Sequence, residues 1–292
     1  MTPQASVADW IEGARLRTLP AAIAPVAAGT GVAAAIDAVV WWKAALALVL
    51  ALAMQIGVNF ANDYSDGIRG TDADRVGPAR LVGSGLAAPR TVKGAAFACF
   101  ALGAVCGFVL AATTSWWLLA IGVAAIAAAW TYTGGPRPYG YHALGEISVF
   151  VFFGLVAVLG TTFVQAQRLT VTAWLTAVGV GCLACAILVA NNLRDIPTDR
   201  QTGKYTLAVV LGDRGSRVMY VALMVAPIVA VAAIAAVETA WALLALLCVP
   251  FAARAVTRVA GRATGAQLVP VLRDTGLTEL AWAVCLAIGL AL

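Results

Sequence analysis

Charged residues are scarce in this chain. Asp, Glu, Lys and Arg make up 11% of its 292 residues, against about 25% in soluble domains, whereas 62% of the residues are hydrophobic. A soluble protein of this length could not cover its surface with so few charges. The net charge of +5 has no polar folded surface to occupy, which also excludes a nucleic-acid-binding protein.

Histidine and cysteine, the usual metal and redox side chains, are also few. The single histidine, His142, follows a Gly- and Pro-rich turn, and we expect it to cap a helix or to hydrogen bond at the membrane interface. All six cysteines fall in apolar segments. Cys182 and Cys185 form a C-x-x-C pattern, but among apolar neighbours a thiol packs like a small hydrophobic group. The pattern therefore indicates packing rather than zinc or redox chemistry.

Long apolar runs fill most of the chain. Spans of about 20 mostly apolar residues are typical of helices that cross a bilayer. We expect nine, at about residues 19–40, 43–61, 93–114, 115–133, 144–163, 170–191, 217–237, 239–257 and 275–292. The sequence thus predicts an all-α membrane protein in which residues 1–292 form one domain and one helical bundle.

Basic residues predict the orientation of this bundle. Seventeen of the nineteen lysines and arginines fall in alternate connecting segments, and only Lys43 and Arg168 lie on the other side. By the positive-inside rule, the N-terminus and the long loops face the cytoplasm of a cell-membrane protein. A signal peptide is excluded because more spans follow the first. Residues 1–18 are expected to lie along the cytoplasmic interface, with one helical face formed by Val7, Trp10, Ile11 and Ala14.

A duplicated acidic motif is the strongest functional signal. Asn62 and Asp66 form an Asn-x-x-x-Asp pattern that Asn191 and Asp195 repeat 129 residues later. Six of the fourteen acidic residues cluster at these two places, namely Asp63, Asp66, Asp72, Asp74, Asp195 and Asp199. Residues four apart share a helical face, and carboxylate and amide oxygens are the ligands that Mg²⁺ accepts. A loop that only balances charge has no need of the same pattern twice.

Positive charges follow both clusters and complete a site for a diphosphate. They are Arg69, Arg75 and Arg80 after the first cluster, and Arg200 and Lys204 after the second. A magnesium-bound diphosphate needs cations near the charge that grows as it departs. The alternative, which accounts for most of these arginines, is a set of solvated loop charges that obey the positive-inside rule.

The loop between the two motifs contains further candidates. Arg137 is its only basic residue and could bind a diphosphate through two hydrogen bonds. Tyr139 and Tyr141 could be either interfacial anchors or site residues. Glu146 lies just inside the next apolar span, and a carboxylate in such a place is a site candidate by default.

With these residues in view, the chain resembles the UbiA superfamily of intramembrane aromatic prenyltransferases. Within it, the chain is most similar to the enzymes that prenylate 1,4-dihydroxy-2-naphthoate. The resemblance runs from about Arg15 to Gly212 and depends on residues 59–72, 132–146 and 191–209. The general first motif has a third acid where this chain has Gly70, so the naphthoate group's Asp72 takes that role.

The resemblance implies a bundle of two pseudo-repeated halves around a central cavity that opens to membrane lipid. The implied cytoplasmic caps are residues 62–92, 134–143 and 193–216. The implied ligands of Mg²⁺, or of Mn²⁺ in its place, are Asn62, Asp66, Asp72, Asp195 and Asp199. Arg137 and Lys204 would hold the departing diphosphate. The implied substrate-binding residues are Asn59, Asp63, Tyr64, Arg75, Arg80, Tyr132, Asn191, Asn192 and Glu146.

The implied reaction joins a polyprenyl diphosphate to 1,4-dihydroxy-2-naphthoate. Loss of diphosphate gives an allylic cation, which the ring attacks at its carboxylated carbon, releasing CO₂ and forming a demethylmenaquinol. Nearby aromatic rings could stabilise the cation, each by about 0.5–2 kcal/mol; the candidates are Phe60, Tyr64, Trp130, Tyr132, Phe152 and Phe153.

Two alternatives remain open. One is a prenyltransferase of the same superfamily with another acceptor, and the other is a secondary transporter. The transporter is disfavoured because the acidic motifs lie at one membrane face, whereas carriers place coupling carboxylates near the midplane.

Overall fold

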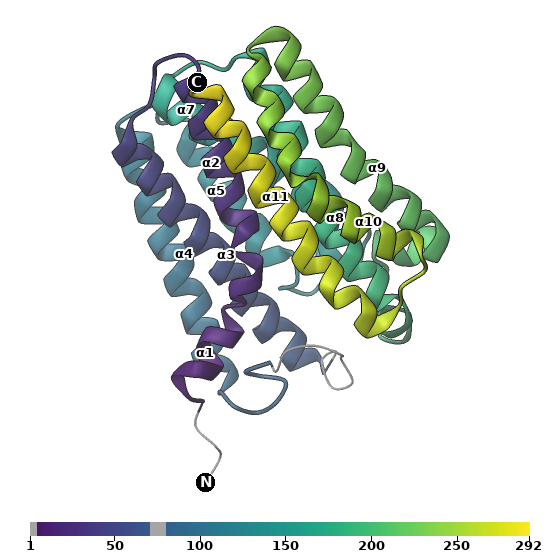
Figure 1. Cartoon of the computed structure of the whole chain (residues 1–292). Coiled ribbons are helices and arrows are strands. Elements are labelled where there is room, and N and C mark those ends of the chain that lie inside the picture. Colours follow the sequence, from purple (N-terminus) through teal and green to yellow (C-terminus); the bar gives the residue numbers. More distant parts are fainter. Residues whose placement is uncertain (1–4, 71–79) are drawn as a thin grey trace.

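The computed structural model describes residues 5–70 and 80–292, and this part of the chain is helical, as predicted (Figure 1). Its first half consists of α1 (Val7–Gly13), η1 (Leu16–Thr18), α2 (Pro20–Ala34), α3 (Trp41–Arg69), α4 (Pro89–Ala112), α5 (Leu118–Thr131) and η2 (Tyr139–Tyr141). The remainder consists of α6 (Gly145–Val149), the π-helix η3 (Phe150–Leu159), α7 (Gly160–Ala166), α8 (Val171–Gln201), α9 (Leu207–Val237), η4 (Ala240–Cys248), α10 (Val249–Ala260), η5 (Gly265–Leu268) and α11 (Val269–Leu290).

The length and apolar character of these helices are those of a multi-pass membrane protein. Within the described residues, six helical segments are long and apolar enough to cross a membrane: Trp41–Arg69, Pro89–Ala112, Gly145–Ala166, Val171–Gln201, Leu207–Val237 and Ala240–Ala260. The other three predicted spans coincide with α2, α5 and α11, of which α2 and α5 are shorter, with 15 and 14 residues. The number of crossings stays a prediction.

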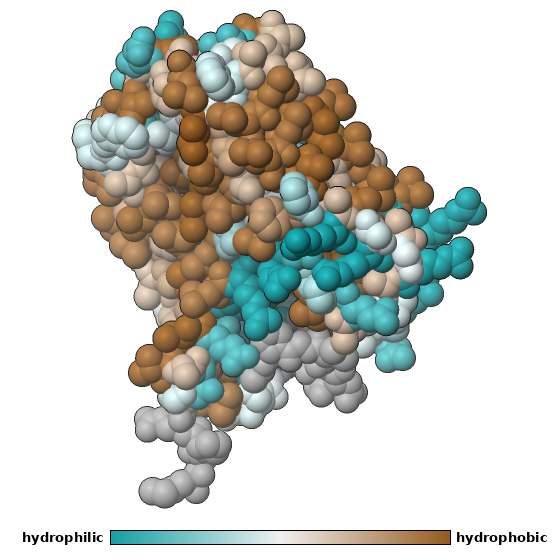
Figure 2. Space-filling model, in the orientation of Figure 1, coloured by the Kyte–Doolittle hydropathy of each residue, from teal (hydrophilic) through white to brown (hydrophobic). Residues whose placement is uncertain are grey.

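Helix α8 lies at the centre of the bundle. Its apolar window is 72% buried, against 22–44% for the other five long segments. It packs on α9, on η3 and on α11. Glycines permit this close packing, because a Cβ on Gly154 of η3 would lie 2.7 Å from the Cα of Gly181. The apolar outer faces of the surrounding helices form the broad hydrophobic surface in Figure 2.

Both motif-bearing helices extend beyond their predicted spans. The prediction ended these spans at residues 61 and 191, but α3 continues to Arg69 and α8 to Gln201. Gly70 ends α3 in the left-handed region with a φ of 72°, where glycine is favoured. The motifs therefore lie on the final turns of two helices, which hold their side chains more firmly than a loop would.

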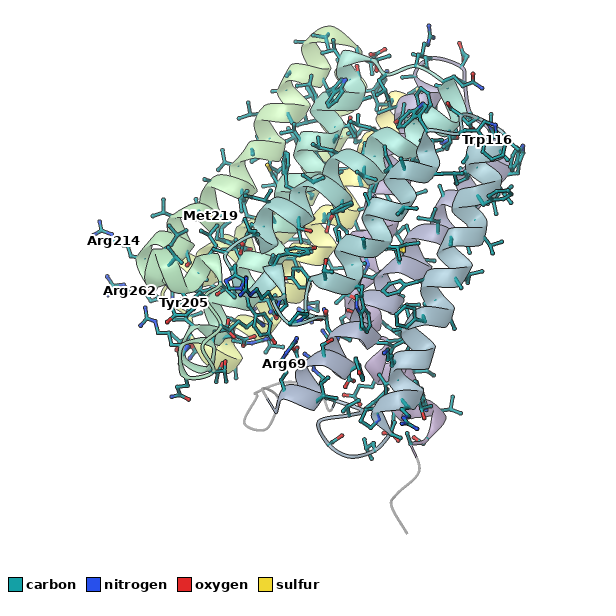
Figure 3. The ribbon with its side chains drawn as sticks, turned by 180° about the vertical axis from the view of Figure 1, so that it is seen from behind. Arg69, Trp116, Tyr205, Arg214, Met219 and Arg262 are labelled. Carbon is teal, nitrogen blue, oxygen red and sulfur yellow. The ribbon has the colours of Figure 1, made fainter. Side chains whose placement is uncertain are left out.

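The polar connections gather at one end of the bundle. In Figure 3, Arg69, Tyr205, Arg214 and Arg262 lie toward this end, and Trp116 lies near the opposite one. Helix α1 is also at this end, next to the end of α3 (Figure 1).

The predicted apolar face of α1 is only partly buried against the rest of the protein. Trp10 packs edge-on against Phe60 at 5.5 Å, whereas Val7 and Ile11 are 77% and 49% exposed. Phe60 is buried in this contact and packs in a core cluster; its cation-stabilising role stays a prediction.

Candidate functional site

The first motif lies on the last two turns of α3, against the loop that precedes η2. Asp66 is 5% exposed, and its Oδ1 accepts a 2.8 Å hydrogen bond from the hydroxyl of Tyr141. Its Oδ2 lies 3.9 Å from the Nη2 of Arg80. Asn62, four residues earlier, accepts a 2.7 Å hydrogen bond at Oδ1 from the hydroxyl of Thr133. Amide and carboxylate oxygens of the first motif thus share one helical face.

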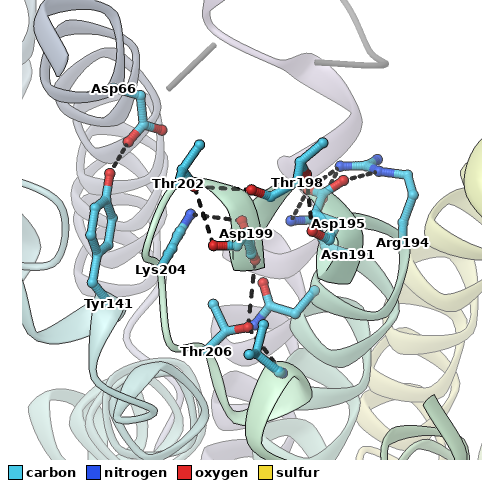
Figure 4. A network of polar contacts seen from close by, with 12 residues as sticks. Asp66, Tyr141, Asn191, Arg194, Asp195, Thr198, Asp199, Thr202, Lys204 and Thr206 are labelled. Carbon is cyan, nitrogen blue, oxygen red and sulfur yellow. Dashed lines mark hydrogen bonds and ion pairs between the residues drawn. The ribbon is translucent and has the colours of Figure 1, made fainter. Parts of the chain in front are cut away.

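The second motif repeats this placement at the end of α8 (Figure 4). The side chains of Asn191 and Asp195 are adjacent, with Nδ2 3.5 Å from Oδ2. Arg194 holds both oxygens of Asp195, at 2.6 and 2.7 Å. One turn later, Asp199 is buried, and its Oδ1 lies 4.0 Å from the Nζ of Lys204.

A short turn brings Lys204 back over the end of α8. Gly203 has a φ of 72°, and the backbone N–H of Lys204 donates a 2.9 Å hydrogen bond to the carbonyl of Asp199. A residue with a Cβ would be strained at this φ. The turn fixes the distance between the lysine ammonium and the carboxylate of the same segment.

One tyrosine of the central loop, Tyr141, connects the two acidic clusters. Tyr141 binds Asp66 through its hydroxyl, and its ring lies 4.9 Å from the Nζ of Lys204. Its carbonyl also accepts a 3.0 Å hydrogen bond from the N–H of Tyr205. The hydroxyl of Tyr132 lies beside the start of α6, since a Cβ on Gly145 would be 3.3 Å from it. Asp66 at the end of α3 and the Lys204 turn beside Asp199, far apart in sequence, therefore meet at Tyr141.

Glu146 lies at the start of α6 and contacts Asn192 of α8. It is 4% exposed, and its Oε1 accepts a 3.0 Å hydrogen bond from the Nδ2 of Asn192. Its Oε2 has no hydrogen-bond partner among the described residues. A buried carboxyl oxygen without a partner is costly. A ligand hydroxyl could supply the missing donor.

Two residues predicted to bind substrate, Asn59 and Asp63, have hydrogen-bond partners within the protein, and their substrate role stays a prediction. Both oxygens of Asp63 accept backbone N–H groups, from Leu81 at 2.8 Å and from Val82 at 3.0 Å. Asn59 donates to the carbonyl of Ala14 and to the hydroxyl of Thr18, both at 2.9 Å.

Two further side chains of α3, Tyr64 and Arg69, also have partners within the protein. Tyr64 stacks on Trp130 with 6.1 Å between ring centroids, beside Lys93 of α4. Arg69 donates to the carbonyls of Thr133 and Gly135 and so holds the central loop.

The remaining predicted residues are peripheral or outside the described structure. Arg137 is exposed at the tip of the central loop. Asp72 and Arg75 lie outside the described residues. Tyr139 serves packing, with its hydroxyl 2.9 Å from the carbonyl of Ala128, and burial raises the pKa of this hydroxyl. His142 is exposed, and its backbone pairs with Tyr205.

Three side chains with notable surroundings were not among the predicted site residues. Tyr141 was left between anchor and site, and Arg194 was counted only as a topology signal. Glu279, in the middle of α11, is fully buried, and neither carboxyl oxygen has a hydrogen-bond partner within the described residues. An acidic residue inside an apolar run is a signal that could have identified it.

The oxygen atoms of the two motifs suit a metal ion that also binds phosphate oxygens of a substrate. In residues 5–70 and 80–292, no three His, Cys, Asp or Glu side chains converge into a protein-only cation cluster. Mg²⁺ usually takes one or two carboxylates and completes its octahedron with water and substrate phosphate oxygens. Two Asn–Asp pairs at the ends of α3 and α8, with Asp199 one turn beyond the second pair, match that need.

Fold and site together define a class: a multi-pass helical membrane protein with paired acidic motifs at one end. A scan against protein families matches residues 22–268 to the UbiA prenyltransferase family. The chain belongs to this family, which confirms the resemblance seen in the sequence.

Two curated relatives of this chain share one enzyme name. The chain is 56% identical over 287 residues, 98% of each chain, to the 1,4-dihydroxy-2-naphthoate octaprenyltransferase of Mycobacterium tuberculosis. It is 37% identical to the Escherichia coli protein of the same name, over 91% of this chain and 89% of that one. A solved UbiA homologue from Archaeoglobus fulgidus, bound to GPP and Mg²⁺, shares the fold with a TM-score of 0.71 at 15% identity, covering 97% of this chain and 99% of its own.

Proposed function

We propose that this protein transfers a polyprenyl group from a polyprenyl diphosphate to 1,4-dihydroxy-2-naphthoate, a step of menaquinone biosynthesis. The observation that carries the proposal is that Tyr141 contacts both Asp66 of the first motif and Lys204, which lies beside Asp199 of the second acidic cluster. The near full-length identity to enzymes named for this reaction supports the choice of acceptor.

Asn62 and Asp66 on one side, and Asn191, Asp195 and Asp199 on the other, would hold Mg²⁺, with Mn²⁺ as an alternative ion. Asp72, outside the described residues, would be a further ligand. When bound, the ion would neutralise the diphosphate and so favour its departure. The Archaeoglobus fulgidus relative binds Mg²⁺ together with a prenyl diphosphate, which supports this choice.

Positively charged side chains would stabilise the negative charge that develops on the departing diphosphate. Lys204 and Arg80 lie 4.0 and 3.9 Å from motif carboxylates, close to where the diphosphate would be held. Preorganised positive groups at the position of developing charge are an effective source of rate enhancement. Arg137, exposed at the rim, would contact the diphosphate from the loop.

The acceptor would lie on the Glu146 side of the motifs. The free Oε2 of Glu146 would accept a hydrogen bond from a ring hydroxyl of the naphthoate, while Asn192 holds Oε1. In the reaction the allylic C–O bond breaks and a C–C bond forms at the carboxylated ring carbon. The carboxylate leaves as CO₂ and its bonding electrons restore the aromatic ring, giving a demethylmenaquinol.

Placement in the cell membrane with the site facing the cytoplasm is part of the proposal. Its support is that the motifs and the arginine-rich connections lie at the same end of the bundle (Figure 3). Residues 1–292 would act as one transferase domain whose cavity opens to lipid and accepts the polyprenyl tail.

The test is a transfer assay with the purified protein in lipid. It would contain Mg²⁺, a labelled polyprenyl diphosphate, and either 1,4-dihydroxy-2-naphthoate or 4-hydroxybenzoate, with products identified by mass spectrometry. We expect a prenylated, decarboxylated product from the naphthoate alone. Transfer to hydroxybenzoate alone would overturn the acceptor. Uptake of label into vesicles without any Mg²⁺-dependent product would favour a transporter.

A further inference from the structure

The guanidinium of Arg194 lies on the oxygens of the second motif. Its Nε and Nη2 bind the two carboxylate oxygens of Asp195, at 2.6 and 2.7 Å. The same Nη2 is 2.8 Å from the Oδ1 of Asn191. The Arg194 side chain is only 7% exposed. One cation therefore engages all three oxygens that the second motif offers (Figure 4).

The equivalent oxygens of the first motif are held differently. The Oδ1 atoms of Asn62 and Asp66 accept hydrogen bonds from the neutral hydroxyls of Thr133 and Tyr141. Arg80 lies 3.9 Å from Asp66, beyond hydrogen-bond distance. In the second copy, a guanidinium hydrogen bonds directly to the motif oxygens.

We propose that Arg194 is an internal counter-ion that occupies the second motif in the substrate-free protein and leaves it for the substrate diphosphate when a divalent cation binds. This inference rests on the proposed function, which places a metal at Asn191 and Asp195. Arg194 and the metal compete for the same oxygens, so both cannot bind them fully at once.

The displaced guanidinium needs a new anion, because a buried unpaired charge is strongly unfavourable. A diphosphate beside Asp195 supplies that anion, and an arginine can bind it through two parallel hydrogen bonds. Arg194 therefore makes metal binding and diphosphate binding mutually favourable, since each ligand removes an obstacle to the other. A divalent cation alone binds the second motif weakly.

The test measures Mn²⁺ binding to the purified full-length protein in nanodiscs by electron paramagnetic resonance. Binding is measured with and without a geranyl thiolodiphosphate, a slowly reacting substrate analogue. For Arg194→Gln we expect Mn²⁺ to bind about tenfold more tightly without the analogue, since a charge-assisted hydrogen bond is lost from the competing state. The tightening of Mn²⁺ binding by the analogue should become smaller than in the unchanged protein.

A matched control removes one positive charge elsewhere at the same end. Arg214 is exposed on α9 (Figure 3), and Arg214→Gln should leave Mn²⁺ affinity unchanged within about twofold, because exposed charges are screened by salt. If Arg194→Gln does not fold, Arg194→Lys serves instead. Lysine keeps the charge but cannot form the two-pronged contact, so a smaller tightening is expected.

The outcomes separate this inference from the proposed function. Unchanged or weaker Mn²⁺ binding in the Arg194 variant that folds overturns the counter-ion role, because an arginine that merely orients Asp195 would weaken metal binding when lost. Absence of any Mn²⁺ binding to the unchanged protein, with the analogue present, overturns the metal site itself.

Discussion

Replacement of Tyr141 by phenylalanine tests whether the central loop couples the two motifs. The change removes the hydroxyl that donates a 2.8 Å hydrogen bond to Asp66 and retains the ring beside Lys204. A hydrogen bond to a charged group contributes about 1.5–3 kcal/mol. Since about 1.4 kcal/mol corresponds to a factor of ten in rate, we expect kcat/KM to fall about tenfold to hundredfold.

The dependence on Mg²⁺ identifies the cause of this fall. Without its hydroxyl donor, Asp66 loses orientation as a metal ligand, so Tyr141→Phe should need more Mg²⁺ for half-maximal transfer. The control is Tyr139→Phe, whose hydroxyl contacts the Ala128 carbonyl and Ser148 rather than an acid. It should lower stability by about 1 kcal/mol and leave the Mg²⁺ requirement unchanged. Equal Mg²⁺ titrations for both variants would refute the coupling through Tyr141.

Further substitutions separate the parts of the site. Asp66→Asn or Asp195→Asn should abolish prenyl transfer without loss of helical circular dichroism, and near-normal turnover at saturating Mg²⁺ would contradict the metal assignment. Asp63→Ala should lower the free energy of unfolding by about 2 kcal/mol or more, since two amide groups lose their acceptor, and an unchanged thermal midpoint would count against this anchor. Glu146→Gln should raise KM for the naphthoate but not for the prenyl diphosphate; the reverse pattern would place the acceptor elsewhere.

The residues of α3 show how far sequence reasoning could go. Because residues three and four apart share a helical face, the sequence predicts that Asn59, Asn62, Asp63 and Asp66 lie along one side of a helix. It does not reveal what each side chain contacts. The structure places Asn62 and Asp66 against the central loop, and Asn59 and Asp63 against Ala14, Thr18 and residues 81–82.

The contact between Arg194 and Asp195 could not be predicted from the sequence. Adjacent residues on a helix do not face each other, so nothing in the sequence predicts that Arg194 binds its neighbour Asp195. The contact exists because the long side chain curls back over the end of α8 in a largely buried setting. Only the packing of neighbouring elements produces that setting.

The sequence by itself determined the membrane class, the apolar helices and the duplicated Asn-x-x-x-Asp pattern, because composition and local periodicity suffice for each. Tertiary structure alone decided that Tyr141 joins Asp66 to the Lys204 turn, that Asp63 anchors a loop, and that Glu146 pairs with Asn192. These contacts join segments 18 to 75 residues apart. Such pairings depend on how the helices pack, and local sequence does not encode that packing.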